Sequence, residues 1–296
     1  MSKYHIPVLL QETLTALQIT EGKKYIDATV GGGGHASEIL RLGGKVLGLD
    51  EDQDAIEYVK EKFKVQIGKE LVLVRGNFRD IGRIARESGF ENVAGILLDL
   101  GVSSYQIDTP QRGFSFMHEG PLDMRMHKET AVMAKDLVNG LTEGELTELF
   151  QKLGEEPKAR RIAKIIVEDR KIHPITTTRE LVSSIAKAYK VRADSTGTIA
   201  HIASRIFQAL RIAVNDELHA LEEALPQGIA LLGSGGRMAV ITFHSLEDRI
   251  VKKSFLRFEN NGVGTILTKK PILPSDYEER ENRRARSAKL RVFEKL

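Results

Sequence analysis

Residues 24–50, KYIDATVGGGGHASEILRLGGKVLGLD, decide the fold of this chain. They open with a short apolar strand over 24–28, turn through four consecutive glycines, and continue as a predicted helix over 35–42. A second apolar strand then ends at Asp50. Short apolar strands that alternate with helices predict a parallel sheet covered on both faces. This stretch therefore predicts an α/β fold in which a glycine loop joins the first strand to a helix.

The same alternation extends on both sides of this stretch. Two further strands are predicted over 71–74 and 95–98, and the second of them runs into Asp99. The accompanying helices are predicted over 8–17, 54–63 and 81–88. Residues 1–107 are therefore expected to form the first part of an α/β core.

After residue 107 the pattern changes to helices alone. Two capping boxes, Thr142 with Glu145 and Thr177 with Glu180, mark helix starts. The predicted helices cover 142–153, 157–169, 177–189, 200–213 and 217–225. A run of helices with no strand between them indicates a separate all-α unit, which we expect over 108–212 for substrate recognition.

Strands return in the last part of the chain, 213–296. An apolar strand is predicted over 236–243 and a helix over 247–258. Two closing strands are predicted over 265–269 and 289–293, with no helix signal between them. We expect these two strands to form an antiparallel pair at the edge of the sheet. The helical unit is thus predicted to be inserted in the α/β domain rather than appended to it.

The composition excludes several kinds of site. There is no cysteine, which rules out disulfides, thiolate zinc sites and a cysteine nucleophile. The eight histidines show no paired metal-ligand spacing, so no protein-held metal is expected. The net charge is only +3, so any nucleic acid must be bound through local patches. No apolar run approaches the roughly 20 residues that span a bilayer, and residues 1–5 lack the apolar core of a secretory signal. A cytoplasmic protein with no membrane partner is expected.

Two cofactors suit a glycine loop after the first strand. Gly31, Gly33 and Ala36 match the G-x-G-x-x-A pattern of dinucleotide sites, and Asp50 follows at the distance of the acid that binds a ribose hydroxyl. A tight turn without a ligand is also compatible with the pattern. Asp50 would then belong to an acidic turn that caps the next helix.

Three features favour S-adenosylmethionine over NAD. Asp27 lies before the loop, where a pyrophosphate would be repelled and a methionine ammonium group attracted. Asp50 can accept hydrogen bonds from both ribose hydroxyls. The closing antiparallel strands resemble the seven-stranded methyltransferase sheet. Asp99 lies where the strand order is expected to reverse, which is the usual ligand position of open α/β sheets, and Phe78 follows the third strand, where it would flank the adenine or join the core.

These features predict the class I Rossmann-like fold of S-adenosylmethionine methyltransferases, with an inserted all-α domain. The sequence also resembles the RsmH/MraW family in motifs that extend from residue 5 to residue 291. They are HIPVL (5–9), GGGGH (31–35), LDLGVSS (98–104), RGFSF (112–116), GPLDMRM (120–126), FHSLEDR (243–249) and NRRARSAKLR (282–291).

The resemblance implies a methyltransferase that acts on the N4 amine of a cytidine in the decoding region of small-subunit (16S) ribosomal RNA. It implies cofactor contacts at Gly33, Gly34, His35, Asp50, Phe78, Asp99 and Gln106. The loop 31–34 is all glycine here, where relatives often have a larger residue in second place. A backbone cradle should tolerate that difference.

The chemistry expected at the target atom has two candidate residues. Methylation of C5 in a pyrimidine normally requires a cysteine, whereas methylation of an exocyclic amine requires an acceptor that holds the N–H. Most amine methyltransferases carry an Asp/Asn-Pro-Pro-aromatic motif after the fourth strand, and this chain has DLGV at 99–102 instead. Asp99 is the catalytic candidate by position, although it can also serve the cofactor alone. His244, at the end of the fifth predicted strand, is the second candidate, and Ser245 with Asp248 is an alternative helix cap there.

Candidate substrate contacts lie in two places. An expected loop carries arginines and phenylalanines that either stack an extruded base or pack inside a folded loop; they are Arg112, Phe114, Phe116 and Arg125. A C-terminal basic run is expected to hold RNA phosphates through Arg283, Arg284 and Arg286. A third basic group, on a predicted helix, is read as a solvated face; it comprises Lys158, Arg160, Arg161 and Lys164.

Other functions stay open on the residues alone. An NAD-dependent oxidoreductase, a methyltransferase acting on protein, and a non-enzymatic RNA-binding assembly factor all remain compatible with the pattern. The expected partner is small-subunit ribosomal RNA, either free or in the assembled small subunit. The oligomeric state is not predicted.

Overall fold

The computed structural model describes residues 7–192 and 197–296, and it divides the chain into two compact units. We call Met1–Ser103 with Leu218–Leu296 the core unit, and Ser104–Glu217 the helical unit. The predicted insert, 108–212, falls inside the helical unit. Residues 5 and 6 of the HIPVL motif, and the segment 1–5 tested for a secretory signal, lie outside the described residues.

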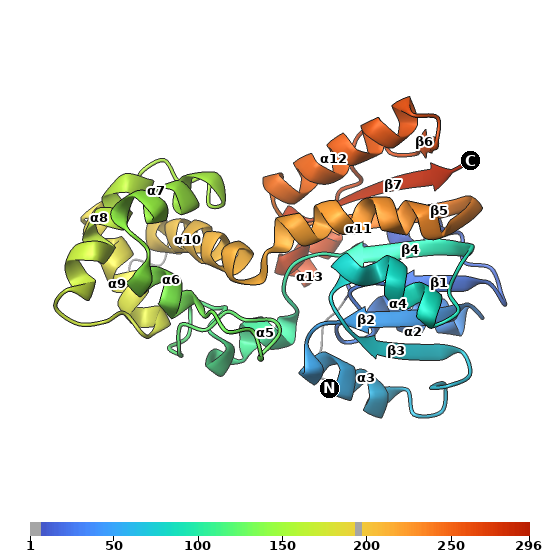
Figure 1. Ribbon diagram of the computed structural model, residues 1–296, viewed down its shortest axis with the longest axis horizontal. Helices are drawn as coiled ribbons and strands as arrows, with labels where there is room; N and C mark the ends of the chain where they lie inside the picture. The colour runs from blue at the N-terminus through green and yellow to red at the C-terminus, as the bar shows by residue number, and fades with distance from the viewer. Residues whose placement is uncertain (1–6, 193–196) are drawn as a thin grey trace. The chain divides into compact units, whose positions relative to one another are not determined.

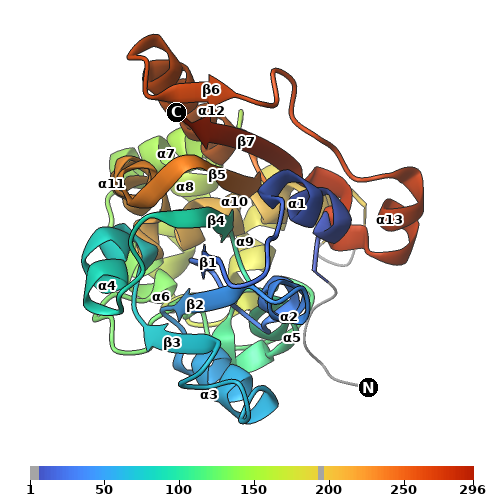
Figure 2. The ribbon, with the colours of Figure 1, turned by 90° about the vertical axis from the view of Figure 1, so that its right-hand side faces the viewer.

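The core unit contains one seven-stranded sheet in the order β3-β2-β1-β4-β5-β7-β6 (Figures 1 and 2). The first five strands are mutually parallel, and β7 pairs antiparallel with both β5 and β6. The strands are β1 (Lys24–Asp27), β2 (Lys45–Asp50), β3 (Leu71–Arg75), β4 (Val93–Asp99), β5 (Leu232–Thr242), β6 (Gly264–Ile266) and β7 (Lys289–Lys295). Each predicted strand is present, and the antiparallel closing pair is confirmed. This is the Rossmann-like arrangement expected of methyltransferases.

Alternate side chains of the strands enter two different cores. Ile26, Leu47 and Met238 face one core, while Tyr25 and Val46 face the other. The first face is covered by α4 (Ile81–Glu87), α11 (Glu217–Leu231) and α12 (Ser245–Asn260). The second is covered by α1 (Leu10–Leu17), α2 (Gly34–Arg41) and α3 (Gln53–Lys62). Burial on both faces explains the nearly continuous apolar character of these strands.

Two predictions about the core unit were wrong. A short helix, α13 (Asp276–Glu281), and a 3-10 turn over Arg283–Ser287 lie between β6 and β7, where no helix was expected. Ser275 caps α13 by accepting from the amide of Glu278, but six residues are too few to give an apolar period. The helix predicted to end at 225 also continues through Pro226 to Leu231, because Leu225 and Ile229 on either side of the proline are buried in the core.

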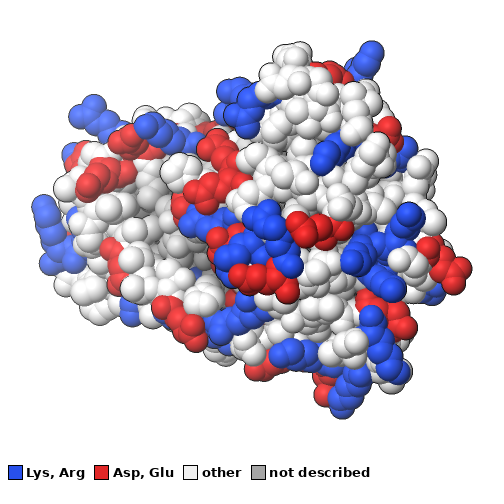
Figure 3. Space-filling model, turned by 45° about the vertical axis from the view of Figure 1, so that its right-hand side comes forward, with Lys and Arg blue, Asp and Glu red and all other residues white. Residues whose placement is uncertain are grey.

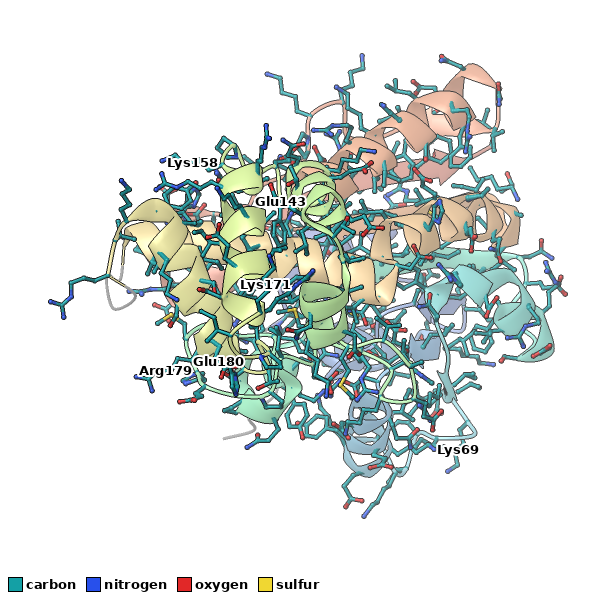
Figure 4. The ribbon with its side chains drawn as sticks, turned by 60° about the vertical axis from the view of Figure 1, so that its left-hand side comes forward. Lys69, Glu143, Lys158, Lys171, Arg179 and Glu180 are labelled. Atoms are coloured by element: carbon teal, nitrogen blue, oxygen red, sulfur yellow. The ribbon has the colours of Figure 1, made fainter. Side chains whose placement is uncertain are left out.

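The helical unit is built from six helices and short turns, with no strand among its described residues, 104–192 and 197–217. They are α5 (Ser104–Asp108), α6 (Ala134–Gly140), α7 (Glu143–Lys152), α8 (Ala159–Arg170), α9 (Thr178–Tyr189) and α10 (Thr198–Asn215). Both predicted capping boxes are confirmed, since Thr142 and Thr177 accept from the amides of Glu145 and Glu180. The short helices α5 and α6 were not predicted. Figure 4 labels two exposed charged side chains of this unit, Lys171 directly after α8 and Arg179 on α9.

Within the described residues, no helix has both the length and the apolar run that crossing a membrane requires.

Candidate active site

The glycine loop follows β1 and begins α2. Gly31 and Gly33 have positive φ angles of 48° and 68°, a region that glycine enters at no steric cost. A Cβ on Gly33 would lie 2.8 Å from the Phe63 ring. Gly33 is also the N-cap of α2, and it supplies no side chain to the amides of the first turn. These amides are the kind of donor that binds an anionic or polar ligand.

One buried and one largely buried carboxyl group lie at the carboxyl ends of the neighbouring strands β1 and β4, where the strand order reverses. Asp27 is 1% exposed, and the side chain of Asp99 is 16% exposed. Burial raises the pKa of Asp27 to about 7, and the charge of Asp50 acts in the same direction. Hydrogen bonds from the amides of Thr29 and Ala36 lower this pKa, but they do not outweigh the effect of burial. Burial also raises the pKa of Asp99 well above its usual value, with the charges of Asp27 and Glu247 acting in the same direction. Both carboxyl groups therefore favour the protonated form, and a positive charge placed beside them would favour the ionised form.

Asp99 has an incomplete set of partners. Its amide donates to the Thr29 hydroxyl at 2.7 Å, which fixes the backbone at the end of β4. Its Oδ2 lies 3.7 Å from Nδ1 of His35, beyond hydrogen-bond distance. Its Oδ1 is buried and has no hydrogen-bond partner among the described residues. A buried acceptor without a partner carries a desolvation cost that a bound donor would remove.

His35 is held in one orientation at the start of α2. Its Nε2 lies 3.2 Å from the Val8 carbonyl, which can only accept, so Nε2 carries the proton. The other ring nitrogen, Nδ1, faces Asp99. Gly34, the next residue toward the loop, leaves room for Pro7, whose ring lies 3.1 Å from the position a Cβ would take. The cofactor contacts of Gly34 and His35 stay predictions.

Asp50 ends β2 and anchors the glycine loop. Its Oδ2 accepts from the Gly31 amide at 2.9 Å, and its Oδ1 accepts from the Asp52 amide at 2.9 Å. Asp52, not Asp50, caps α3 by accepting from the Asp54 amide. The ribose contact stays a prediction.

Phe78 and Gln106 lie on different units. Phe78 begins a 3-10 turn after β3, is partly exposed, and packs against the core beneath the sheet. Gln106 is buried in α5 of the helical unit. Both cofactor contacts stay predictions.

His244 caps α12, and this corrects the expected cap at Ser245. Its Nδ1 accepts from the Glu247 amide at 3.3 Å, while Oε2 of Glu247 accepts from the amides of Phe243 and His244 at 2.8 and 3.3 Å. Because Nδ1 accepts, the neutral ring carries its proton on Nε2. That atom lies 3.1 Å from Oε1 of Glu247, in a geometry that makes no hydrogen bond. His244 is therefore arranged as a hydrogen-bond donor rather than as a base.

Glu247 is the functional candidate that the sequence analysis missed. It is 2% exposed and raises the pKa of Asp99. The signal was present, because Glu247 follows His244 at the spacing of a capping box. Histidine is a less usual cap than serine, so Ser245 was preferred.

The predicted base-stacking residues are engaged inside the helical unit. Buried Arg112 donates from Nη2 to the carbonyls of Arg125 and Met126, at 3.0 and 3.1 Å. Arg125 forms a bidentate pair with Asp123, with Nε 2.8 Å from Oδ1 and Nη2 2.9 Å from Oδ2. These contacts give Arg112 and Arg125 a structural role within the helical unit. Their role at the substrate stays a prediction.

The two phenylalanines of this loop pack within the same unit. Phe114 is buried beneath the Arg112 guanidinium, whose carbon lies 5.8 Å from the ring centre. Phe116 meets Phe207 edge to face, with ring centres 5.7 Å apart. Stacking of a base on either ring also stays a prediction.

The C-terminal basic run is divided by its contacts. Arg283 and Arg286 are exposed, Arg284 is half-buried, and all three lie on the 3-10 turn before β7. Arg291 is buried in β7, with its Nε 2.6 Å from Oδ1 of Asp248. The basic residues of the run therefore include both surface groups and a structural ion pair. Figure 3 shows acidic and basic side chains interspersed on one face, as the small net charge suggests.

Comparisons with known proteins cover the whole chain. A family model described as the MraW methylase family matches residues 2–296. The ribosomal RNA small subunit methyltransferase H of Carboxydothermus hydrogenoformans is 46% identical over 308 residues, covering 99% of this chain and 98% of that protein. Among solved structures, a putative rRNA methylase from Clostridium thermocellum matches at 12% identity and a TM-score of 0.46, covering 99% of this chain and 98% of the other. An rRNA methylase from Streptococcus thermophilus matches at 12% identity and a TM-score of 0.47, covering 99% of each chain.

Proposed function

The chain belongs to the MraW methylase family, and from that premise we propose that it methylates the N4 amine of a cytidine in the decoding region of small-subunit ribosomal RNA. It is an S-adenosylmethionine-dependent ribosomal RNA methyltransferase. The target atom and its place in the RNA are the parts that we propose. The observation that carries the proposal is the pair of carboxyl groups with raised pKa values, Asp27 and Asp99, at the switch point of the sheet in a chain without cysteine.

The residues at the ends of β1, β2 and β4 fit S-adenosylmethionine. This cofactor supplies an electrophilic methyl group on a positively charged sulfur, together with an ammonium group. Buried acids with raised pKa values stabilise such cations, because a nearby positive charge favours the ionised carboxylate. A pyrophosphate would instead meet the repulsion of Asp27, which argues against NAD. We propose Asp27, Gly33, Gly34, His35, Asp50, Phe78, Asp99 and Gln106 as the cofactor contacts.

Asp99 is the group that we assign to the target amine. Methylation joins the methyl carbon to N4 and requires N4 to lose one proton. An acceptor that holds this N–H also exposes the nitrogen lone pair, which is otherwise delocalised into the ring. The unpartnered Oδ1 belongs to a carboxyl group whose pKa is raised by burial, and a raised pKa makes the carboxylate a stronger base. We propose that this oxygen accepts the N–H and then the proton.

His244 is assigned to orientation. Its Nε2–H is fixed as a donor by the bond that Nδ1 accepts, so it can donate to a ring acceptor of the substrate but cannot take up the N4 proton at that atom. Glu247 holds the imidazole in place through the helix cap. This division leaves the proton to Asp99.

RNA contacts are proposed outside the cofactor site. We propose Arg283, Arg284 and Arg286 as phosphate contacts, and the helical unit, with Arg112, Phe114, Phe116 and Arg125, as the part that recognises the substrate. Replacing the three C-terminal arginines with alanine should flatten the slope of log affinity against log salt by about 2, because each phosphate on a single strand contributes about 0.7. Parallel lines for the variant and the wild type would remove these arginines from the interface.

The direct test is mass spectrometry of small-subunit ribosomal RNA incubated with the protein and S-adenosylmethionine. We expect one added methyl group on a cytidine, located at N4 by nucleoside analysis, and far slower addition with an Asp99→Asn variant. Free RNA and assembled small subunits should be compared as substrates. A methyl group on another atom would overturn the N4 proposal, and no transfer to either substrate would favour a non-enzymatic assembly factor. We propose the cytoplasm as the compartment in which this substrate is met.

A further inference from the structure

A second concentration of positive charge lies on α12 and around β6. Residues 249–270 contain six basic residues and one acid, Glu259, whereas the whole chain has a net charge of +3. Oε1 of Glu259 accepts from the Ile266 amide at 2.8 Å, so the acid serves to join α12 to β6. Within the described part of the chain, the exposed lysines of the segment form no ion pair; they are Lys252, Lys253, Lys269 and Lys270.

Two of these lysines line a cavity of about 280 Å³ between α12, β6 and β7. Its apolar wall is formed by Phe255 and Leu256 of α12 and Ile266 of β6. Lys252 lies on the α12 side and Lys269 lies just after β6. Ligand pockets usually occupy about 300–1,000 Å³, so this one suits a single base better than a larger ligand.

Two further residues that line the cavity, Arg291 and Thr268, are held by hydrogen bonds within the protein. Arg291 donates two hydrogen bonds to Asp248, from Nε to Oδ1 at 2.6 Å and from Nη2 to Oδ2 at 3.3 Å. Burial acts to raise the pKa of Asp248, but hydrogen bonds and charge from Arg291, with Lys289 and Lys252, outweigh it and hold the pKa below its usual value. Thr268 accepts from the Val292 amide at 2.9 Å. The charge of Lys252 acts on Asp248, but neither Lys252 nor Lys269 forms an ion pair within the described part of the chain.

We propose that this cavity binds one nucleotide of the substrate RNA, with the base against Phe255, Leu256 and Ile266 and the phosphates near Lys252 and Lys269. An apolar slot beside unpaired lysines matches the flat base and charged backbone of single-stranded RNA. The cavity also lies close enough to the candidate active site for one RNA strand to reach both. Lys252 lies eight residues beyond His244 on α12, about 12 Å along the helix axis. The inference rests on the proposed function, because it assumes an RNA substrate.

The first test measures the affinity of a single-stranded RNA oligonucleotide across a salt series. In Lys252→Ala/Lys269→Ala, the slope of log affinity against log salt should flatten by about 1.4, since each lost phosphate contact removes about 0.7. Lys252→Arg/Lys269→Arg should keep the wild-type slope. The matched control is Lys60→Ala/Lys69→Ala, which removes two exposed lysines at the β3 end of the sheet and should leave the slope unchanged. Affinity for S-adenosylmethionine should be the same in all four proteins.

The second test detects the base directly. The chain contains no tryptophan, so Leu256→Trp places a single tryptophan, which can be excited selectively, at the cavity. A stacked base should quench its emission when the oligonucleotide is added. Leu273→Trp, at an exposed position outside the cavity, is the matched control and should be quenched much less.

Three results would overturn the nucleotide site. They are parallel salt lines for the alanine variant and the wild type, equal flattening in the Lys60/Lys69 control, and equal quenching of both tryptophans. Loss of polyglutamate binding without loss of RNA binding would assign the cavity to an acidic peptide instead. These outcomes are separate from failure of the proposed function, which would show as wild-type protein that binds RNA but transfers no methyl group.

Discussion

The carboxyl ends of β1 and β4 and the loop 112–125 both carry buried charged side chains, but the two regions satisfy them differently. In the loop, Arg112 donates to two carbonyls and Arg125 pairs with Asp123. At the strand ends, burial raises the pKa of both Asp27 and Asp99, and the charge of Asp27 adds to the shift of Asp99. Oδ1 of Asp99 has no hydrogen-bond partner among the described residues.

The difference separates two uses of a buried charge. A satisfied group such as Arg112 contributes to the stability of its own unit. An unsatisfied acid costs stability until a ligand binds to it, and such groups are concentrated at functional sites. In the sequence, both kinds of group are charged residues within motifs, so only their contacts in the structure distinguish a structural charge from a functional one. The following experiments test this distinction, starting with the largest expected effect.

Asp99→Asn should lower the rate of methyl transfer by about 10²–10⁴-fold, the usual contribution of a general base. The amide has nearly the same shape but cannot accept the N4 proton. Thermal stability should be unchanged or higher, because a carboxyl group with an unfavourable environment is removed. Single-turnover kinetics and calorimetric titration with the cofactor measure the two effects separately.

A parallel loss of cofactor affinity in this variant would make Asp99 a cofactor ligand only. An unchanged rate would remove it from the site.

Arg112→Ala should reduce the free energy of unfolding by about 3 kcal/mol, because two carbonyls lose a charged donor inside the helical unit. Chemical denaturation measures the change. The control is Arg160→Ala on the exposed face of α8, which should shift stability by less than about 0.5 kcal/mol. If Arg112→Ala is as stable as the wild type but binds RNA weakly, Arg112 serves the substrate rather than the fold. The contrast drawn above between this loop and the strand ends would then be wrong, and the prediction that the loop contacts a base would gain support.

Asp50→Ala should weaken S-adenosylmethionine binding by about tenfold to a hundredfold, from the loss of roughly 1.5–3 kcal/mol of charged hydrogen bonding. Part of the loss would come from the Gly31 amide, which Asp50 also holds. Asp52→Ala removes the neighbouring cap of α3 without the loop contact and is the matched control. Equal affinities of wild type and Asp50→Ala in calorimetry would refute the ribose assignment.

Cofactor affinity should depend on pH through Asp27. Its pKa of about 7 means that the carboxyl group is mostly protonated at pH 6 and mostly ionised at pH 8. A cation is bound by the ionised form, so affinity should be about tenfold weaker at pH 6 than at pH 8, and Asp27→Asn should remove the dependence.

The same raised pKa fixes the sign of a stability effect. The folded chain binds this proton more tightly than the unfolded chain, so the free energy of unfolding should fall as pH rises from 3.8 to about 7. A wild-type affinity that is flat across pH 6 to 8 would contradict the role of Asp27.

The sequence predicted the fold well because its signals are local. The glycine loop, the strand-end acids and the two capping boxes each lie within a few neighbouring residues, and all of them are present in the structure. The errors are also local in origin. The six-residue helix α13 is too short for a period, and Pro226 signals a helix end that packing of Leu225 and Ile229 overrides.

The candidate site was predicted in part. Asp27, Asp50 and Asp99 follow from their positions at strand ends, because parallel strands bring their carboxyl ends to one edge. Glu247 was missed, since its importance comes from contact with His244 and from its effect on Asp99 across the sheet. The lysines at the cavity beside α12 were missed because Lys252 and Lys269 are separated by a helix end and a strand.

The sequence by itself determined a Rossmann-like sheet interrupted by a helical unit and three acids at its strand ends. Periodicity, capping and turn chemistry operate over a few residues, so they can be read without coordinates. Only the tertiary structure decided which charged groups have their hydrogen bonds satisfied. Arg112 donates to carbonyls and Arg291 to Asp248, whereas Oδ1 of Asp99 has no partner among the described residues. Those partners come from other elements of the chain, and the pKa of a buried group is set by everything packed around it.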